Sequence, residues 1–304
     1  MRTTSPLLVA VAAALLLTSC LKERRQAEIA AAKLLISDEQ ENQLGLQVKQ
    51  ELQQQGVKYL DDPAVVKYVR DITNRILPFA KKDRPGVVWS IYVIDDPKTV
   101  NAFATPGGNL FVYTGLLLAA ENEAELAGVM SHEAGHVVGR HSARAMVNTY
   151  GLQTVTGMAL GKNPGQIKQV AATLAATGII RAHGRSEETE ADEYGVKYSS
   201  SAGYDPHGLS TFFQKLAARE GKGNAVVALL STHPPSADRV RHANQVIAQK
   251  HLTGKELGTE RLAPIKAALQ AHKTPAAAPA APVSTETPAP TSPAPKGKGA
   301  GFLR

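Results

Sequence analysis

Two histidines and a glutamate near the middle of the chain form the pattern HExxH. His132 and His136 lie four residues apart, and Glu133 directly follows the first histidine. Residues four apart lie on the same face of a helix, so both imidazoles can bind one zinc ion. Glu133 can then act as a general base on a zinc-activated water molecule. Because only three positions are fixed, the pattern also occurs by chance in proteins without a metal, and a third ligand is needed to decide.

The residues around this pattern predict a buried helix. Asn122 is a favourable N-cap, and Glu125 three residues later completes a capping-box pattern. The positions that follow are mostly apolar, as at Leu126, Val129, Met130, Val137 and Val138. Histidines inside such a helix need partners, because burying an unpaired polar group is costly.

A third histidine at the usual spacing is absent. In the HExxHxxGxxH arrangement it would follow the second histidine by six residues, and Ser142 stands there. His141 misses this position by one residue, and at about 100° per residue it points far from His136 on a continuous helix. We therefore expect His141 to support the site or to pack beside it rather than to bind the metal.

A later acidic segment offers a carboxylate ligand instead. Within residues 187–193, Glu188 and Asp192 combine i, i+4 spacing with the order Glu-xxx-Asp. Glu188 is the candidate third ligand, and Asp192 is the candidate partner for the free N–H of a ligand histidine. The alternative is a solvated helix start, because carboxylates are favourable in a first turn. The other acidic side chains should point elsewhere: Glu187, Glu190 and Glu193.

A β-hairpin is predicted directly before the HExxH helix. Residues 87–94 have a strand pattern and are followed by a turn at 95–97. Residues 101–104 then lead into a tight turn over 106–108, and a second strand follows over 109–113. An edge strand there would hold an extended peptide substrate by main-chain pairing. The candidate substrate-binding residues are Asn101, Ala102, Phe103 and Ala104. A plain structural hairpin explains the same pattern equally well.

Capping patterns predict the flanking helices. Ser37 with Gln40 begins a helix that stops at Gly56, and the Asp62-Pro63 pair begins another that ends at Pro78. Residues 151–180 are rich in Ala, Gly and Thr and form either a packed helix pair or a mobile lid. Further helices are predicted over 185–199, from 205 through 216, and over 236–250.

The first residues predict export and a lipid anchor. An apolar stretch over residues 6–17 follows Arg2 and is too short to span a membrane comfortably. It ends in Leu17-Thr18-Ser19-Cys20, which resembles a bacterial lipobox, so Cys20 is the predicted lipidation site. The alternative is an ordinary cleaved signal peptide. Leu21, in place of an aspartate, favours the outer membrane over the inner membrane for a periplasmic lipoprotein.

Composition and charge argue against nucleic acid as a partner. The chain has 304 residues and a formal net charge of +7, but its basic residues are scattered without aromatic interleaving, so we expect no nucleic-acid binding. Residues 273–304 are rich in Pro and Ala and predict a disordered basic tail. The predicted segments are a signal peptide (1–19), a tether or first helix (20–36), a catalytic domain (37–252), a helical extension (253–272) and the tail.

Four motifs in this order resemble the M48 family of zinc metallopeptidases. They are the hairpin segments 101–108 and 112–117, the HExxH segment 131–141, the acidic motif 185–192, and Thr232-His233-Pro234-Pro235 with Arg239. Gly184 stands where the acidic motif usually has serine. The resemblance covers roughly residues 37–250. It implies a mainly α-helical (α+β), zincin-like fold with a small β-hairpin or sheet beside the HExxH helix.

The resemblance also implies a site and a reaction. One zinc ion would be held by His132, His136 and Glu188, and Glu133 would move a proton from the water to the leaving amine. His233 and Arg239 are the candidate donors to the oxyanion of the tetrahedral intermediate. A second role for His233 is to cover the open zinc position until a substrate displaces it.

The function implied is that of a zinc endopeptidase of the cell envelope, anchored to a membrane through Cys20. Unfolded or misassembled envelope proteins are the implied substrates. A first alternative is a non-catalytic, metal-stabilised chaperone or assembly lipoprotein that uses the same groove. The presence of Glu133 argues against it, because a structural zinc site needs no base. A weaker alternative is a cell-wall binding protein that uses the basic tail.

Overall fold

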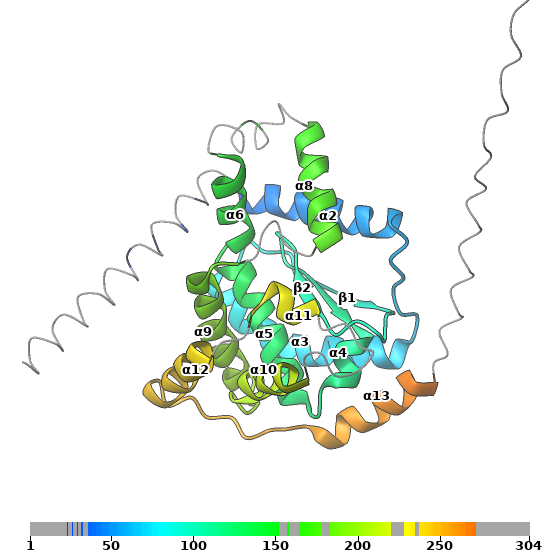
Figure 1. The fold of residues 1–304 in the computed structure, drawn as a ribbon, viewed down its shortest axis with the longest axis vertical. Coiled ribbons are helices and arrows are strands. Elements are labelled where there is room, and N and C mark those ends of the chain that lie inside the picture. The colour runs from blue at the N-terminus through cyan, green and yellow to red at the C-terminus, as the bar shows by residue number, and fades with distance from the viewer. Residues whose placement is uncertain are drawn as a thin grey trace, which may run out of the picture. The chain divides into compact units, whose positions relative to one another are not determined.

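The computed structural model describes residues 36–151, 164–177, 183–219, 228–234 and 237–271, together with the single positions 23, 26, 29, 32 and 157. Within these residues the chain is mainly helical with one small sheet, which confirms the predicted fold class (Figure 1). The predicted signal peptide, Cys20 and the tail 273–304 lie outside the described residues, as do most of the tether and parts of 151–180. Among the described helices, none has the length and apolar character needed to cross a membrane.

Three short strands form the sheet in the order β1-β3-β2. β2 (Ala102–Ala104) and β3 (Asn109–Tyr113) form the predicted hairpin, and Gly107 and Gly108 in its turn have φ values of 78° and 91°. β1 (Ser90–Ile94) pairs with β3 in parallel, which was not predicted. The first strand begins three residues later than predicted, because Val88 is exposed and the ladder starts at Ser90. β2 is therefore an edge of the described sheet.

The HExxH helix α5 (Glu123–Val138) lies at the centre of the fold, and all of its residues are buried. Asn122 caps it by accepting a hydrogen bond from the Glu125 N–H at 3.0 Å, while the Glu125 carboxylate accepts from the Glu121 N–H instead of closing the predicted capping box. Helix α9 (Arg185–Ser201) packs closely on α5, since a Cβ on Gly135 would lie 2.8 Å from the Cβ of Tyr194. This contact brings the two predicted ligand segments together.

Among the elements whose bounds the structure describes, two helices precede the sheet. α2 (Asp38–Gln54) has the predicted Ser37 capping box and ends before Gly56, whose φ is 81°. α3 (Pro63–Asp83) begins after Asp62 as predicted, but the prediction that it ends at Pro78 was wrong. Pro78 is exposed, so water can satisfy the carbonyl that its missing N–H leaves free, and the helix continues for another turn that buries Ala80.

The other helices within the described residues surround this centre. They are α4 (Thr114–Ala119), α6 (His141–Tyr150), α8 (Pro164–Thr177), α10 (Gly208–Arg219), α11 (Ala228–Thr232), α12 (Ala237–Gln249) and α13 (Thr259–Ala271). α10 begins later than predicted, because Asp205 and Pro206 form a turn in which the Gly208 N–H donates to the Asp205 carbonyl. α8 is the helix described within the predicted stretch 151–180, and it packs on α2. The choice between a packed helix pair and a mobile lid for the whole stretch stays a prediction.

The sheet separates two apolar clusters. Side chains of α3, α5, α10 and α13 pack on one face of the sheet against Ala102 and Val112. α2, α6 and α8 pack on the other face, where the rings of Phe103 and Phe111 stack with centroids 4.7 Å apart. Figure 1 shows α2 and α8 on one side of the strands and α3 and α5 on the other. Successive side chains of β2 and β3 therefore point to opposite faces of the sheet and pack against different helices, with α5 on the face of Ala102 and Val112.

Candidate metal centre

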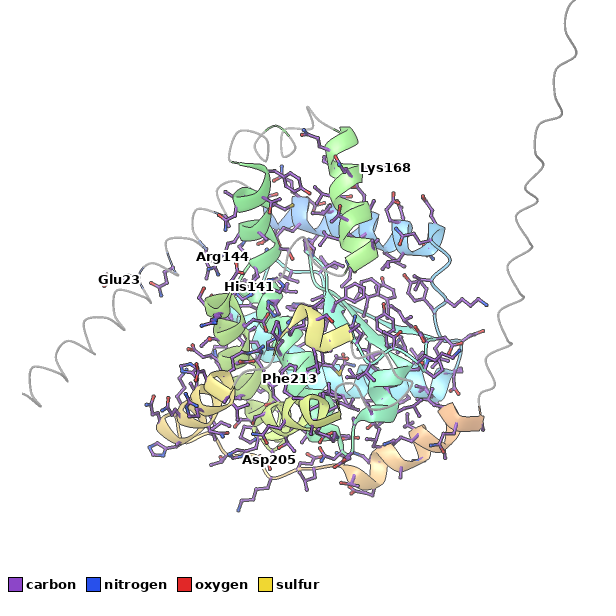
Figure 2. All side chains as sticks on the ribbon, in the orientation of Figure 1. Glu23, His141, Arg144, Lys168, Asp205 and Phe213 are labelled. Atoms are coloured by element: carbon purple, nitrogen blue, oxygen red, sulfur yellow. The ribbon has the colours of Figure 1, made fainter. Side chains whose placement is uncertain are left out.

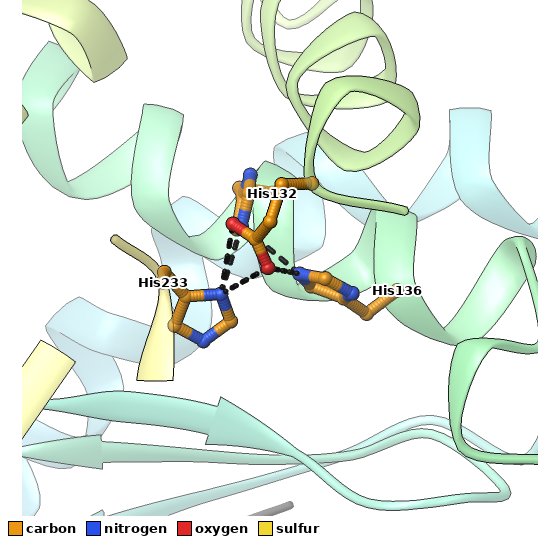
Figure 3. Close-up of side chains that lie close together, drawn as sticks. His132, His136 and His233 are labelled. Atoms are coloured by element: carbon orange, nitrogen blue, oxygen red, sulfur yellow. Dashed lines mark hydrogen bonds and ion pairs between the residues drawn. The ribbon is translucent and has the colours of Figure 1, made fainter. Parts of the chain in front are cut away.

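Four buried side chains converge beside α5: His132, His136, Glu188 and His233. The Nε2 atoms of the two α5 histidines are 3.0 Å apart, and Nδ1 of His233 lies 3.3 Å from Nε2 of His132. The Glu188 carboxylate, from α9, is 3.0 Å from His233 Nδ1 and 3.5 Å from His136 Nε2. One ligand atom of each residue lies within 4.8 Å of every other. Figure 3 shows the three imidazoles pointing toward one another.

This donor set fits a metal ion. Three imidazole nitrogens and one carboxylate oxygen face a common point, and nitrogen with oxygen donors suits ions such as zinc. The surroundings favour positive charge there. Burial opposes ionisation of Glu188, but His233, His132 and Arg239 hold its pKa below the ordinary value. Burial likewise opposes charge on His233, yet Glu133 and Glu188 raise its pKa.

Asp192 contacts the ring of His132, and Arg239 in turn binds Asp192. Asp192 Oδ1 lies 3.0 Å from His132 Nδ1, the position that the sequence predicted for it. Arg239 donates to both oxygens of Asp192 at 2.7 Å, lies 2.7 Å from Glu188, and donates to the Pro234 carbonyl at 2.9 Å. These contacts direct the guanidinium of Arg239 toward other protein groups. Its predicted role as an oxyanion donor stays a prediction, and its geometry favours a positioning role.

His136 has a separate set of supporting residues. His141 Nδ1 lies 2.7 Å from His136 Nδ1, and Glu190 is 3.3 Å from His141 and 3.0 Å from Arg144. The expectation that His141 points away assumed a continuous helix. The helix is instead broken, because α5 ends at Val138 and Arg140 has a φ of 55°. Figure 2 labels His141 and Arg144 on α6, just beyond this break.

Two residues that support His136, directly or through His141, were not predicted from the sequence. Glu190 was expected to lie on a different face of α9 from Glu188. It is not part of the four-residue cluster, and it contacts His141 and Arg144 instead. His183 was not singled out, and its ring stacks on His136 with centroids 4.2 Å apart. Burial lowers the pKa of His183 to about 4. Gly139, just after the HExxH segment, could have indicated that the helix ends there, so that His141 can approach His136.

Glu133 lies between the ligand cluster and the edge strand. Its Oε2 accepts a hydrogen bond from the Ala104 N–H at 3.1 Å, and its Oε1 is 3.5 Å from His233 Nε2. Burial raises the pKa of Glu133. Among the predicted substrate-binding residues, Ala104 thus contacts the site directly, whereas Phe103 stacks in the core on Phe111. What β2 offers toward the site is therefore its backbone edge.

The chain was compared with known proteins. The profile of peptidase family M48 matches residues 63–247. The mitochondrial metalloendopeptidase OMA1 of Schizosaccharomyces pombe is 35% identical over 176 residues, which cover 57% of this chain and 50% of that protein. The putative beta-barrel assembly-enhancing protease of Vibrio cholerae is 31% identical over 196 residues (61% and 40%), and its Escherichia coli K12 counterpart is 29% identical over 194 residues (60% and 39%). The chain thus spans about half the length of these relatives or less.

Proposed function

Because this chain belongs to peptidase family M48, we propose that it is a zinc-dependent metalloendopeptidase of the bacterial cell envelope. The observation that carries the proposal is the position of Glu133. It lies beside a buried cluster of three imidazoles and one carboxylate, and its side chain is bonded to the edge strand β2. A metal site and a base are what metal-assisted peptide hydrolysis uses, and a strand edge can hold an extended peptide beside them.

The metal would be zinc, held by His132, His136 and Glu188. When bound, zinc supplies a Lewis acid and brings the pKa of water near neutrality. Asp192 Oδ1 lies 3.0 Å from His132 Nδ1, so this nitrogen would carry the ring proton and Nε2 would be free to bind the metal. Arg239 lies 2.7 Å from both Glu188 and Asp192, and its positive charge favours the ionised form of each buried carboxylate.

Glu133 would move the proton. The Ala104 N–H holds Oε2, which leaves Oε1 to take a proton from the attacking water and return it to the nitrogen of the leaving amine. Burial raises the pKa of this carboxyl toward the range in which a group can both accept and donate a proton. His233 Nε2, 3.5 Å from Glu133 Oε1, is the nearest candidate donor to the oxygen of the cleaved carbonyl.

His233 has a second proposed role, as a cover for the metal. Its Nδ1 lies among the other ligand atoms, 3.3 Å from His132 Nε2 and 3.0 Å from Glu188. In this position it would occupy the coordination site that a catalytic zinc keeps for water. The side chain would therefore have to withdraw before a substrate is cleaved.

The substrate would be an extended polypeptide. Phe103 pairs with Phe111 in the hairpin, so the backbone groups of Ala102 and Ala104 face the outer edge of β2. Of the predicted substrate-binding residues, Ala102 and Ala104 would thus bind substrate through the main chain, which requires an unfolded segment. Asn101 and Phe103 turn their backbone groups toward β3 instead. Two bacterial relatives are named beta-barrel assembly-enhancing proteases, which supports envelope proteins as substrates. Lipidation at Cys20 would keep the enzyme at the membrane, with the outer membrane preferred.

A comparison of unfolded and folded substrate tests this function. An outer-membrane β-barrel protein is offered either unfolded in dilute urea or folded in detergent, to the wild-type protein and to Glu133→Gln. We expect the wild type to cleave only the unfolded form and the variant to cleave neither. Equal cleavage of both forms would contradict the extended-substrate proposal, and equal cleavage by both proteins would contradict the role of Glu133.

A further inference from the structure

Helix α2 lies outside the segment that matches the M48 profile, yet Arg84 connects it to the end of the HExxH helix. Arg84 donates a hydrogen bond to the Val137 carbonyl, in the last turn of α5, at 2.5 Å. The same guanidinium lies 2.6 Å from Asp38 and 2.9 Å from Glu41, both in the first turn of α2. Arg84 is 6% exposed and Glu41 only 1%, so the contact is buried.

Arg140 makes a second connection just after α5. Its guanidinium lies 2.6 Å from Glu41, pairs with Asp38, and donates to the Ile36 carbonyl at 2.8 Å. Arg140 is 3% exposed. Glu41 therefore pairs with two buried arginines, of which Arg84 is bonded to the last turn of α5 and Arg140 follows shortly after that turn. Removing one member of such a buried group leaves the other charges unpaired, which is strongly unfavourable.

The start of α2 is also fitted tightly against the β2–β3 turn. A Cβ on Gly45 would lie 2.2 Å from the Pro106 carbonyl oxygen, and one on Gly107 would lie 2.4 Å from Cα of Asn42. The helix thus has little freedom to shift relative to the hairpin. Its carboxylates are presented to Arg140 from a fixed position.

The backbone of Arg140 explains why this connection matters for the metal centre. Its φ of 55° is left-handed, a strained conformation for a residue other than glycine that persists only where the surroundings impose it. The left-handed turn ends α5 and starts α6, and so places His141 Nδ1 2.7 Å from His136 Nδ1. On an unbroken helix His141 would point away from His136.

We propose that α2 is a positioning element of the metal centre. Glu41 and Asp38 hold the guanidinium of Arg140, Arg140 keeps its left-handed turn, and the turn keeps His141 against the ligand His136. The proposal rests on the proposed zinc site, and it extends that site to a helix that precedes the family segment. A metal-ligating histidine whose other nitrogen loses its partner typically binds metal about 10–100-fold more weakly.

The experiment is a double-mutant cycle on zinc affinity. Zinc is titrated against a chromophoric chelator for the detergent-solubilised full chain, as wild type, Glu41→Gln, His141→Ala and the double variant. We expect each single variant to bind zinc about tenfold more weakly. The double variant should bind no more weakly than His141→Ala, because Glu41 acts through His141. The absorption bands of Co²⁺-loaded Glu41→Gln should shift as well.

The matched control is Glu39→Gln, the same change at an exposed position of α2, which should leave zinc affinity unchanged. Additive losses in the double variant, or wild-type affinity in Glu41→Gln, would overturn the proposal. If Glu41→Gln does not fold, Asp38→Asn, at a side chain that is 29% exposed, replaces it under the same criteria. A wild-type protein that binds no zinc would instead overturn the proposed function itself.

Discussion

His136 and His141 face each other across a break between two helices, with their Nδ1 atoms 2.7 Å apart. We predict that His141→Ala lowers zinc affinity about tenfold, because His136 loses the partner that orients its ring. Chelator competition measures the effect. His207→Ala serves as the control, since that imidazole is half exposed and pairs with Asp205 away from the site. Equal zinc affinity in wild type and His141→Ala would show that the contact does not orient the ligand.

A substitution of Arg239 distinguishes a role in positioning Glu188 and Asp192 from a direct role in catalysis. We predict that Arg239→Met lowers the free energy of unfolding by about 3–5 kcal/mol, because Glu188 and Asp192 would keep buried charges without their partner. Urea unfolding of the metal-free protein measures this loss. Arg241→Met, on the same helix with a side chain that is 68% exposed, should change stability by less than about 0.5 kcal/mol. Normal stability with a reduced kcat would instead assign Arg239 the oxyanion role.

A substitution of His233 distinguishes its two proposed roles, which are to cover the metal and to donate to the oxyanion. If its imidazole covers the metal, His233→Ala should raise the rate of casein cleavage by at least about twofold, because a larger fraction of the protein is open to substrate. The spectrum of the Co²⁺-loaded protein should change at the same time. A lower rate would favour the oxyanion role. Unchanged cleavage together with an unchanged spectrum would rule out both roles. His242→Ala, at a partly exposed histidine on α12, is the control.

Much of the site could be predicted because its residues sit at fixed spacings on single helices. HExxH places two imidazoles on one face of α5, and the spacing of Glu188 and Asp192 places both on one face of α9, whatever the rest of the chain does. The hairpin could also be predicted, because its turn residues lie directly between its two strands in the sequence.

What could not be predicted depends on which distant segments meet. The parallel pairing of β1 with β3 joins strands separated by other structure. The approach of His141 to His136 needs the left-handed turn at Arg140, and that turn is held by carboxylates about 100 residues earlier in the chain. Likewise, the helix continues through Pro78 because tertiary packing of the following turn outweighs one missing hydrogen bond.

The ion pairs of Glu256 predict an acid-dependent contribution to stability. Arg75 donates to Glu256 at 3.0 Å, and this hydrogen bond, together with Arg261, lowers the pKa of Glu256 to about 2. Arg75 also binds Tyr204, and Arg261 also pairs with Glu123. A carboxyl whose pKa is lower in the folded than in the unfolded state stabilises the protein above the unfolded value, here 4.5. That contribution disappears as the pH falls toward about 2.

We therefore predict that Glu256→Gln is less stable than the wild type at neutral pH and that the difference shrinks as the pH falls from 4.5 toward about 2. Urea unfolding at a series of pH values measures it. Glu260→Gln, at a carboxylate 3.8 Å from Arg261 and 78% exposed, should show little difference at any pH. A difference for Glu256→Gln that stays constant across this range would contradict the assignment.

The central claim is that Glu133 is the base of a zinc peptidase, and one measurement tests it most directly. Casein cleavage is followed for the wild-type protein and Glu133→Gln, with the zinc content of both determined. The account predicts zinc in both proteins and a rate about 10²–10⁴-fold lower in the variant. Zinc in both with equal cleavage would contradict the role of Glu133, and the absence of zinc from both would contradict the assignment of the metal centre.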